Sequence, residues 1–196
     1  MNTDPTIIKL TNVRLSFPSL HEKQAPMSTG GKAAYKASFL LHKTKNAATI
    51  KALQAAIAHL TKEEFAGKAL PPTNLCLKEA DLKDYDGYDS EHMVLSASNS
   101  KTKPGIVDNE LNTIAQGDAA DPYPGCYVNA TVRLYAQNGK SFKADPTWGK
   151  KINATLRNVQ VMLRGGKPYG EAFGERPPAA EEEFERVEDT AGVDEV

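Results

Sequence analysis

Residues 126–136 read CYVNATVRLYA, and every even-numbered side chain among them is small or apolar. The odd-numbered side chains are polar or amphipathic. Because successive side chains of a strand point to opposite faces, this period of two predicts a β-strand with one face in the core. Asn138-Gly139 follows, a pair typical of a hairpin turn. We therefore expect an antiparallel strand that leads into a hairpin.

Two other segments alternate in the same way but change parity partway. In residues 6–17 the apolar side chains are even-numbered at first and odd-numbered from Val13 onward. Residues 152–163 show a similar change. A change of parity within one strand requires an extra residue, so we predict β-bulges near Thr11-Asn12 and near Arg157-Asn158.

Turn-forming residues follow the first predicted strand. Pro18 lacks a backbone N–H and is expected to end the first strand. Residues 18–31 hold two prolines, two glycines and mostly polar residues, which predicts a long mobile loop. Two further strands are expected at Lys32–His42 and His92–Ser98.

One main α-helix is predicted at residues 46–66. Its apolar side chains recur at helical spacing, with Gly67 as a stop signal and Thr44 or Asn46 as a cap. Residues 73–91 and 105–125 are expected to be irregular. Bent long strands with a single helix favour a mostly β protein, a closed or partly open antiparallel barrel with long loops. An open α+β sandwich is the alternative.

Length and composition predict a soluble protein. The 196 residues suffice for one domain with an appendage and for a core without disulfides or metal. No run approaches the roughly 18 apolar residues of a membrane span, and residues 1–5 lack signal-peptide features. Cys76 and Cys126 form no CxxC motif, which favours a reducing, cytoplasmic location; a disulfide between them is the alternative.

Charge is distributed unevenly along the chain. Residues 175–196 contain nine acidic and two basic residues, whereas residues 1–174 contain 22 basic and 16 acidic ones. A basic body with net charge +6 favours nucleic acid as a partner. The segment 175–196 is too charged to fold alone. We therefore predict a nucleic-acid-binding domain over 1–174 and a disordered acidic C-terminal tail over 175–196.

The tail itself has two predicted roles. A segment of net charge −7 on a flexible tether reaches the basic body at high effective concentration, so it can compete with DNA for a cationic groove. Phe184 and Val196 also offer apolar anchors for a partner protein. A tail that only increases solubility is the alternative.

The candidate binding residues interleave cations with planar rings. Cations neutralise phosphates, and rings stack on unpaired bases at about 1–3 kcal/mol per base. Only single strands expose base faces, and the predicted helix is alanine-rich rather than basic, so single-stranded DNA is favoured over duplex. Phe142 and Trp148 anchoring a loop on the core is the structural alternative. The predicted DNA-binding residues of the 126–136 strand and its following connection are Tyr127, Arg133, Tyr135, Lys140, Phe142, Lys143, Trp148, Lys150 and Lys151.

Four further cations complete the predicted DNA-binding set. Lys101 and Lys103 lie on a Ser/Asn-rich loop, where they suit a flexible phosphate clamp. Arg14 and Lys36 project from the polar faces of the first two strands and could line the same groove. Ordinary solvent-exposed side chains are the alternative for all four.

The sequence contains no complete motif for metal binding or catalysis. Residues 84–89, DYDGYD, resemble a calcium loop, but aligning Gly87 with the loop's glycine puts Leu82 and Met93 at ligand positions. Gly30-Gly31-Lys32 lacks the other residues of a P-loop. Histidines and cysteines lack metal-ligand spacing, and no hydrolase motif occurs. We therefore expect no metal, no cofactor and no enzyme; Tyr85 and Tyr88 are secondary stacking candidates among acidic neighbours.

Three segments resemble a known family: 13-VRLSFP-18, 123-YPGCYVNA-130 and 159-VQV-161. Similar motifs occur in a family of bacteriophage proteins long catalogued as a domain of unknown function. Its members are regarded as phage single-stranded-DNA-binding proteins with an OB-type barrel and an acidic C-terminal tail. The resemblance covers residues 6 to about 174. It implies an OB-like fold and a role in phage DNA replication or recombination in the host cytoplasm, but no particular contact residue.

The leading hypothesis is stoichiometric, sequence-independent binding of single-stranded DNA. Its expected partners are the DNA and replication or recombination proteins that meet the tail, with no membrane. One alternative is a structural or protein-interaction phage component without DNA binding. Another is a Mg²⁺-dependent nuclease or phosphoryl-transfer enzyme that uses Asp81, Asp84, Asp86 and Asp89.

Overall fold

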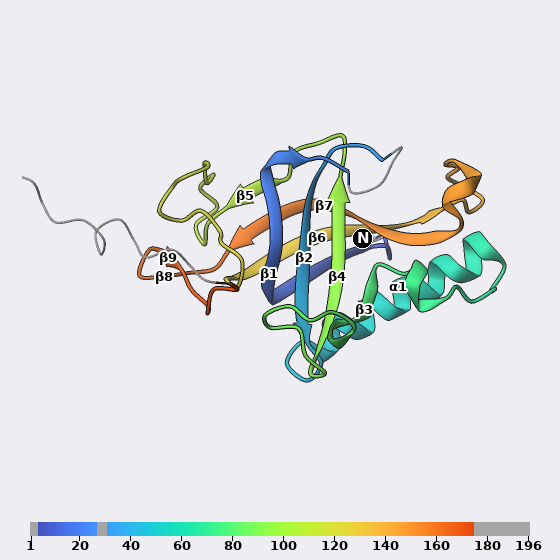
Figure 1. Ribbon diagram of the computed structural model, residues 1–196, viewed down its shortest axis with the longest axis horizontal. Coiled ribbons are helices and arrows are strands. Elements are labelled where there is room, and N and C mark those ends of the chain that lie inside the picture. The colour runs from blue at the N-terminus through green and yellow to red at the C-terminus, as the bar shows by residue number, and fades with distance from the viewer. Residues whose placement is uncertain (1–3, 27–30, 175–196) are drawn as a thin grey trace, which may run out of the picture.

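The computed structural model describes residues 4–26 and 31–174 and contains a closed barrel. The barrel strands pair in the order β4-β2-β1-β6-β7, all antiparallel. A short parallel pairing of β4 with β7, at Ala97–Ala154 and Ser98–Thr155, closes the ring. The predicted OB-like barrel is confirmed (Figure 1). Its strands are β1 (Ile7–Gln24), β2 (Ala34–His42), β4 (His92–Asn99), β6 (Tyr127–Gln137) and β7 (Lys151–Val161).

The other elements attach to the barrel at its edges. Strand β3 (Leu77–Glu79) pairs with β4, and β5 (Gly105–Val107) pairs with β7, so both regions predicted as irregular contain a short strand. The hairpin of β8 (Leu163–Arg164) and β9 (Lys167–Pro168) follows β7. Within the described ranges no helix is long and apolar enough to cross a membrane. The predicted acidic tail lies outside the described residues.

The barrel core follows the predicted alternation of β6. All six even-numbered side chains from Cys126 to Ala136 are at most 5% exposed. Both predicted bulges are confirmed. The β1–β6 register shifts between Leu10 and Val13, where Asn12 has φ 52°, and the β6–β7 register skips Arg157. Each bulge keeps the apolar side chains on the inner face after the change of parity.

Strand β1 does not end at Pro18, and the loop predicted from residue 18 is wrong up to Gln24. The β1–β2 register shifts between Ser16 and Ser19, and Phe17 has φ 46°. This second bulge in β1 takes Pro18 out of the hydrogen-bonded ladder, so its missing N–H is not needed there. Leu20, only 3% exposed, then returns to the core.

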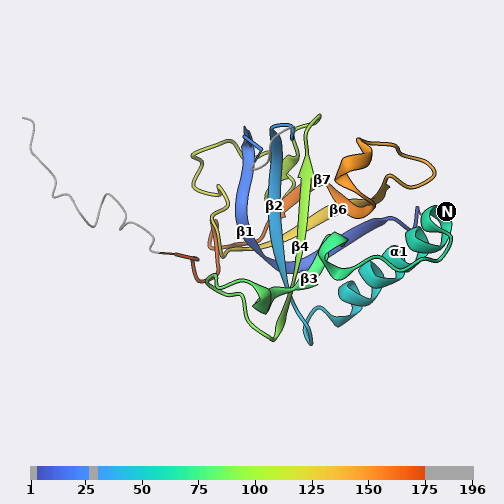
Figure 2. The ribbon, with the colours of Figure 1, turned by 45° about the vertical axis from the view of Figure 1, so that its right-hand side comes forward.

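Helix α1 (Ala47–Phe65) agrees with the prediction to within one residue at each end and packs against β1 and β6 (Figure 2). Its C-cap is Ala66, with a left-handed φ of 52°, and the predicted stop residue Gly67 follows with φ 75°. Asn46 occupies the N-cap position, but its side chain does not cap the helix. Instead it accepts a hydrogen bond from His42 N and donates one to Thr11 O, both 2.9 Å, and so joins the helix start to the first bulge.

The two cysteines are free and buried, as the prediction of a reduced protein requires. Burial raises the pKa of the Cys76 thiol to about 12 and that of Cys126 to about 11. Both therefore act as small apolar side chains of the core.

Candidate nucleic-acid interface

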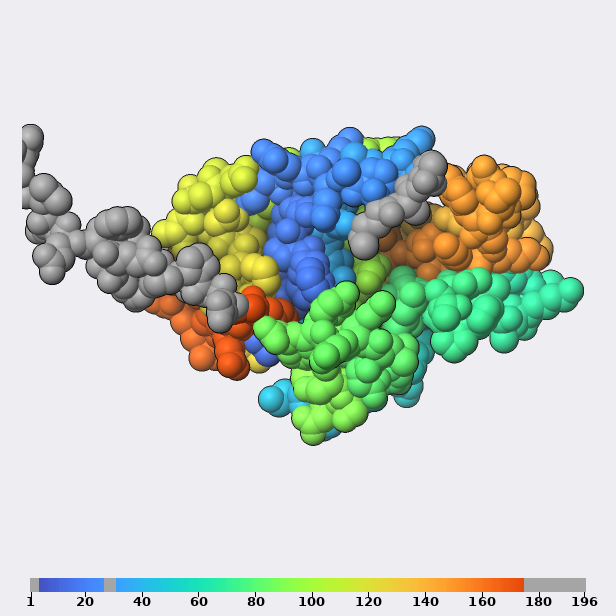
Figure 3. Space-filling view, in the orientation of Figure 1, coloured from blue at the N-terminus to red at the C-terminus, as the bar shows by residue number. Residues whose placement is uncertain are grey.

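The outer face of β2 and β4 carries a strip of polar side chains. Lys36 lies beside Ser98, and Ser38 lies beside Ser96 with 3.3 Å between the hydroxyl oxygens. We call these four residues the polar strip. Figure 3 shows this face, with the blue atoms of β1 and β2 at its centre. Because three of the four side chains are small, an extended polymer can approach the sheet closely here.

Three aromatic side chains border the polar strip, and we call Phe17, Tyr85 and Tyr88 the ring cluster. Phe17 comes from the second bulge of β1, and the tyrosines come from the connection between β3 and β4. The Tyr88 hydroxyl donates a hydrogen bond to Ser16 Oγ at 3.2 Å, and Ser16 pairs with Ser38 of the strip. Burial raises the pKa of Tyr88, so its hydroxyl stays protonated at neutral pH.

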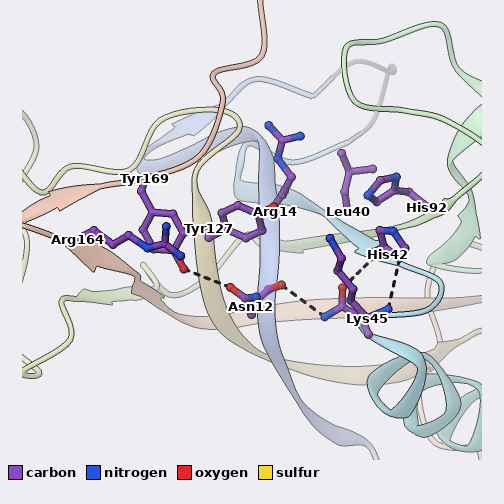
Figure 4. A pocket seen from close by; sticks show the side chains of 10 residues that line it. Asn12, Arg14, Leu40, His42, Lys45, His92, Tyr127, Arg164 and Tyr169 are labelled. Carbon is purple, nitrogen blue, oxygen red and sulfur yellow. Dashed lines mark hydrogen bonds between the residues drawn. The ribbon is translucent and has the colours of Figure 1, made fainter.

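A hollow of roughly 330 Å³ lies further along the same face, beside the first bulge of β1. Its walls combine cationic side chains with tyrosine and histidine rings (Figure 4). The residues that line the hollow are Asn12, Arg14, Leu40, His42, Lys45, Asn46, His92, Tyr127, Arg164 and Tyr169.

One wall of the hollow is a stack of two tyrosines between two arginines. The rings of Tyr127 and Tyr169 are 5.3 Å apart and nearly parallel at 28°. The Arg164 guanidinium lies 3.8 Å from the centre of the Tyr169 ring, and that of Arg14 lies 5.9 Å from the centre of Tyr127. Tyr169 contacts both Tyr127 and Arg164, and Tyr127 has one face against Tyr169, so this wall offers ring edges and guanidinium N–H donors more than an open stacking surface.

The opposite wall contains a pair of histidines. The rings of His42 and His92 meet edge to face with their centres 5.1 Å apart. His92 Nδ1 donates to Asp89 Oδ1 at 2.7 Å, and this hydrogen bond lowers the pKa of Asp89. His42 Nδ1 accepts from Thr44 N at 3.1 Å, which places the proton of its neutral form on Nε2. Both rings are thereby held in defined orientations.

Arg14, a predicted DNA-binding residue, has a structural role as well. Its guanidinium donates hydrogen bonds to the carbonyl oxygens of Gly125 and Glu171 and lies 4.2 Å from the centre of the Phe173 ring. Phe173 packs with Tyr88 on Leu40 and its neighbours, between the polar strip and the hollow. The end of the described chain therefore lies on the face that carries both features.

The residues predicted on β6 and on the connection after it lie in two separate places, at the hollow and at the far end of β6. Tyr127 lines the hollow, whereas Tyr135 lies eight residues further along β6, about 26 Å away at 3.3 Å per residue. There Tyr135 meets Phe142 edge to face at 5.7 Å. Phe142 and Trp148 are 48% and 42% exposed, so neither ring is anchored within the core.

The remaining cations of this group surround the second place, the connection between β6 and β7. Lys143 donates to Gly139 O, and Lys150 Nζ lies 5.8 Å from the centre of the Phe65 ring. Arg133 is 59% exposed and lies 3.4 Å from Asp4. We call the group around this connection the hairpin patch: Tyr135, Lys140, Phe142, Lys143, Trp148, Lys150 and Lys151.

The other predicted cations lie on or near the strip. Lys36 belongs to it, and Lys101 and Lys103 are exposed on the connection that follows β4. Asn99 Oδ1 accepts hydrogen bonds from the backbone N–H groups of Lys101 and Thr102, which orders the start of this connection. Lys23 Nζ donates to Ser100 O beside it.

The acidic residues considered for magnesium do not converge. Among the described residues, no three His, Cys, Asp or Glu side chains lie close enough to hold a metal ion. Asp86 accepts a hydrogen bond from Gly174 N, and Asp89 pairs with His92. The hypothesis of a magnesium-dependent enzyme gains no support from this arrangement.

Several side chains of the interface were missed in the sequence. Lys45, Arg164 and Tyr169 line the hollow but are not among the predicted residues. Lys45 lies just before α1, and the other two lie on either side of the Gly165-Gly166 turn. Arg164 and Tyr169 flank that turn, so predicting a hairpin there would have placed them near each other. Their meeting with Tyr127 had no signal in the sequence.

Comparisons with known proteins agree with this geometry. A family model described as the single-stranded-DNA-binding protein of Enterobacter phage Enc34 matches residues 6–194. Protein p50 of Acyrthosiphon pisum secondary endosymbiont phage 1 is 36% identical over 194 residues, which cover 90% of this chain and 97% of p50.

Solved structures show the same similarity. The single-stranded-DNA-binding protein from bacteriophage Enc34 has a TM-score of 0.68 and 27% identity, over 87% of this chain and 85% of that one. The same Enc34 protein in complex with single-stranded DNA has a TM-score of 0.68 and 26% identity, over 84% of this chain and 90% of that one.

Proposed function

Because the chain belongs to the family of the Enterobacter phage Enc34 single-stranded-DNA-binding protein, we propose that it coats single-stranded DNA without sequence preference. The observation that carries this proposal is the outer barrel face, where the polar strip, the ring cluster and the cationic hollow lie together. Cations and ring faces recognise what all nucleotides share, which is why such a surface binds without reading sequence.

In the proposed complex the strand follows this face. Lys36, Lys45 and Arg164 pair with phosphates. The short serine side chains of the polar strip let the DNA backbone lie near the sheet. The predicted hairpin patch and the pair Lys101 and Lys103 would engage a longer strand. OB folds cover about 4–16 nucleotides, so a single strand can span the distance from the hollow to the hairpin patch.

The proposed role is stoichiometric, in phage DNA replication or recombination within the host cytoplasm. Two features support the binding on which this role depends: the family description names single-stranded-DNA binding, and the Enc34 relative is solved with single-stranded DNA. Binding that protects an unpaired strand requires no catalytic residue.

Titrating labelled oligo-dT, a mixed-sequence single strand and a matched duplex with the protein tests this function. Affinity for the two single strands should be similar and should exceed that for the duplex. Its logarithm should fall with the logarithm of salt concentration with a slope of about −0.7 per neutralised phosphate, hence about −2 for three phosphates. No binding at low salt, or equal affinity for the duplex, would contradict the proposal. Quenching of Trp148, the single tryptophan, shows whether the hairpin patch takes part.

The acidic tail is proposed to compete with DNA for the interface. The last described residues lie on the outer face: Phe173 packs with Tyr88, and Gly174 N donates to Asp86. The tail is therefore attached to the same face that carries the cationic hollow. A tethered segment of charge −7 next to cations competes most effectively at low salt, where screening is weak.

Deleting residues 175–196 is therefore expected to tighten binding of single-stranded DNA about 10-fold at low salt, with a smaller effect at high salt. The measurement is the same anisotropy titration at two salt concentrations. A full-length variant with the tail's Asp and Glu replaced by Asn and Gln separates charge from length and should behave like the deletion. Unchanged affinity in both variants would exclude competition and leave partner recruitment or increased solubility as the role of the tail.

A further inference from the structure

Phe17 is held in an unusual backbone conformation with its ring exposed to solvent. Its φ of 46° lies in the left-handed region that bulky residues rarely adopt, and 53% of the residue is exposed. Neither burial in the core nor strand pairing requires a phenylalanine here, since the register shifts past this position. Exposed strain of this kind is typical of residues that contact a ligand.

The ring of Phe17 retains free surface for a ligand. It meets Tyr85 at 5.0 Å with 71° between the planes, and Tyr88 at 6.3 Å with 62°. Both contacts are edge to face, and such a contact covers at most one face of one of the two rings. Tyr85 is itself 49% exposed and meets Tyr88 edge to face at 87°. Phe17 and Tyr85 therefore keep exposed ring surface, whereas Tyr127 and Tyr169 are stacked on each other.

The packing around Phe17 and Tyr85 holds the two rings in position. Tyr88 is half-buried against Leu40 and Val94 and bonded to Ser16, so it fixes the position of its two neighbours. Pro18 restricts the backbone after Phe17. Gly87 lies so close to Phe173 that an added Cβ would approach a ring carbon to 2.3 Å, so the tyrosine connection is tightly packed at this point. Rings that are already ordered lose little entropy when they bind.

The surroundings select a base rather than a phosphate. Asp84 and Asp86 are exposed beside Tyr85 and would repel a phosphate. The cation Lys36 lies on the other side, on the polar strip that Ser16 and Ser38 join to the ring cluster. A strand with its phosphates along the strip would direct its bases toward the open rings.

We propose that Phe17 and Tyr85 form a nucleobase-stacking site, in which an unpaired base of bound single-stranded DNA lies against their exposed faces. The site rests on the proposed function and adds to it the place where bases, as distinct from phosphates, are held. Since every base has a π-face, such a site contributes affinity without sequence preference.

The test compares normal and abasic single strands of equal length, measured by anisotropy on the full chain. Phe17→Gly is the decisive variant, because glycine accepts a φ of 46° without strain and removes only the ring. It should leave the melting temperature nearly unchanged and weaken binding of oligo-dT about 10-fold, while binding of the abasic strand and the salt slope stay at their wild-type values. Tyr85→Ala should act in the same direction.

Leu111→Gly is a matched control. Leu111 is likewise exposed, 71%, with a positive φ of 68°, but it carries no ring and lies on the connection after β5. It should leave both affinities unchanged. Phe17→Leu keeps an apolar side chain and removes the ring, so it replaces Phe17→Gly should that variant not fold.

Each outcome distinguishes the site from the function on which it rests. Wild-type affinity of the Phe17 and Tyr85 variants for oligo-dT would overturn the stacking site and leave the function intact; in that case the rings would face a protein or solvent. Equal losses on the normal and abasic strands would also overturn it. If the wild-type protein binds neither strand, function and site fail together.

Discussion

Replacing Lys45 and Arg164 together with glutamate is expected to weaken binding of single-stranded DNA about 100-fold at moderate salt. Both cations line the hollow, and each replacement removes one cation that can pair with a phosphate and adds a repelling charge. Because two fewer phosphates are then neutralised, the slope of log affinity against log salt should become shallower by about 1.4. Arg14 is unsuitable for this test because it also hydrogen-bonds Gly125 and Glu171.

The matched control for this double variant is Lys51→Glu with Lys68→Glu. Both lysines are exposed, Lys51 on α1 and Lys68 just beyond its C-terminal end, so the net charge changes equally while the hollow is untouched. The control should lose at most a few-fold in affinity through the general field of the protein. Equal losses in the two double variants would show that net charge, rather than the hollow, determines binding.

Replacing Leu134 with alanine is expected to lower the free energy of unfolding by about 2–5 kcal/mol. Leu134 is 1% exposed and lies in the middle of the closed barrel, where neighbouring strands cannot move inward to fill the space. At about 2–4 °C per kcal/mol for a domain of this size, the melting temperature should fall by roughly 4–20 °C. Urea denaturation followed by circular dichroism measures the free energy directly.

Two variants on the same strand calibrate this result. Leu134→Met keeps the side-chain volume and should cost less than about 1.5 kcal/mol. Arg133→Ala changes the neighbouring side chain on the outer face, where solvent screens the exposed ion pair with Asp4, so the free energy of unfolding should change far less than in Leu134→Ala. A decrease below about 1 kcal/mol for Leu134→Ala would mean that this position is not part of a tightly packed core.

The site was predicted less completely than the fold. Arg14, Lys36 and Tyr127 were predicted from strand faces, and they lie on the strip or in the hollow. The hairpin patch brings rings and cations together, with Phe142 and Trp148 exposed and Tyr135 half-buried, but the length of β6 separates it from Tyr127. Alternation predicts Phe17 on the same face as Val13 and Leu15. The second bulge of β1, which alternation does not reveal, turns Phe17 outward instead.

Alternation and charge, both local properties, sufficed for the main features of this protein. A period of two places the even-numbered residues of β6 inside, and a change of parity requires a bulge, because neighbouring side chains of a strand must point to opposite faces. The excess of basic residues before position 175 likewise needs no structure to be recognised. The barrel class and both predicted bulges followed from alternation, and charge together with the interleaved rings and cations favoured a nucleic-acid partner.

Only tertiary structure decided which distant groups meet. The stack of Arg164, Tyr169 and Tyr127 and the contact of Phe17 with Tyr85 join residues from separate strands and connections. Their approach depends on how the barrel closes through the short β4–β7 pairing and on where each strand bends. Such contacts arise from the summed geometry of the whole ring of strands, which no single stretch of sequence specifies.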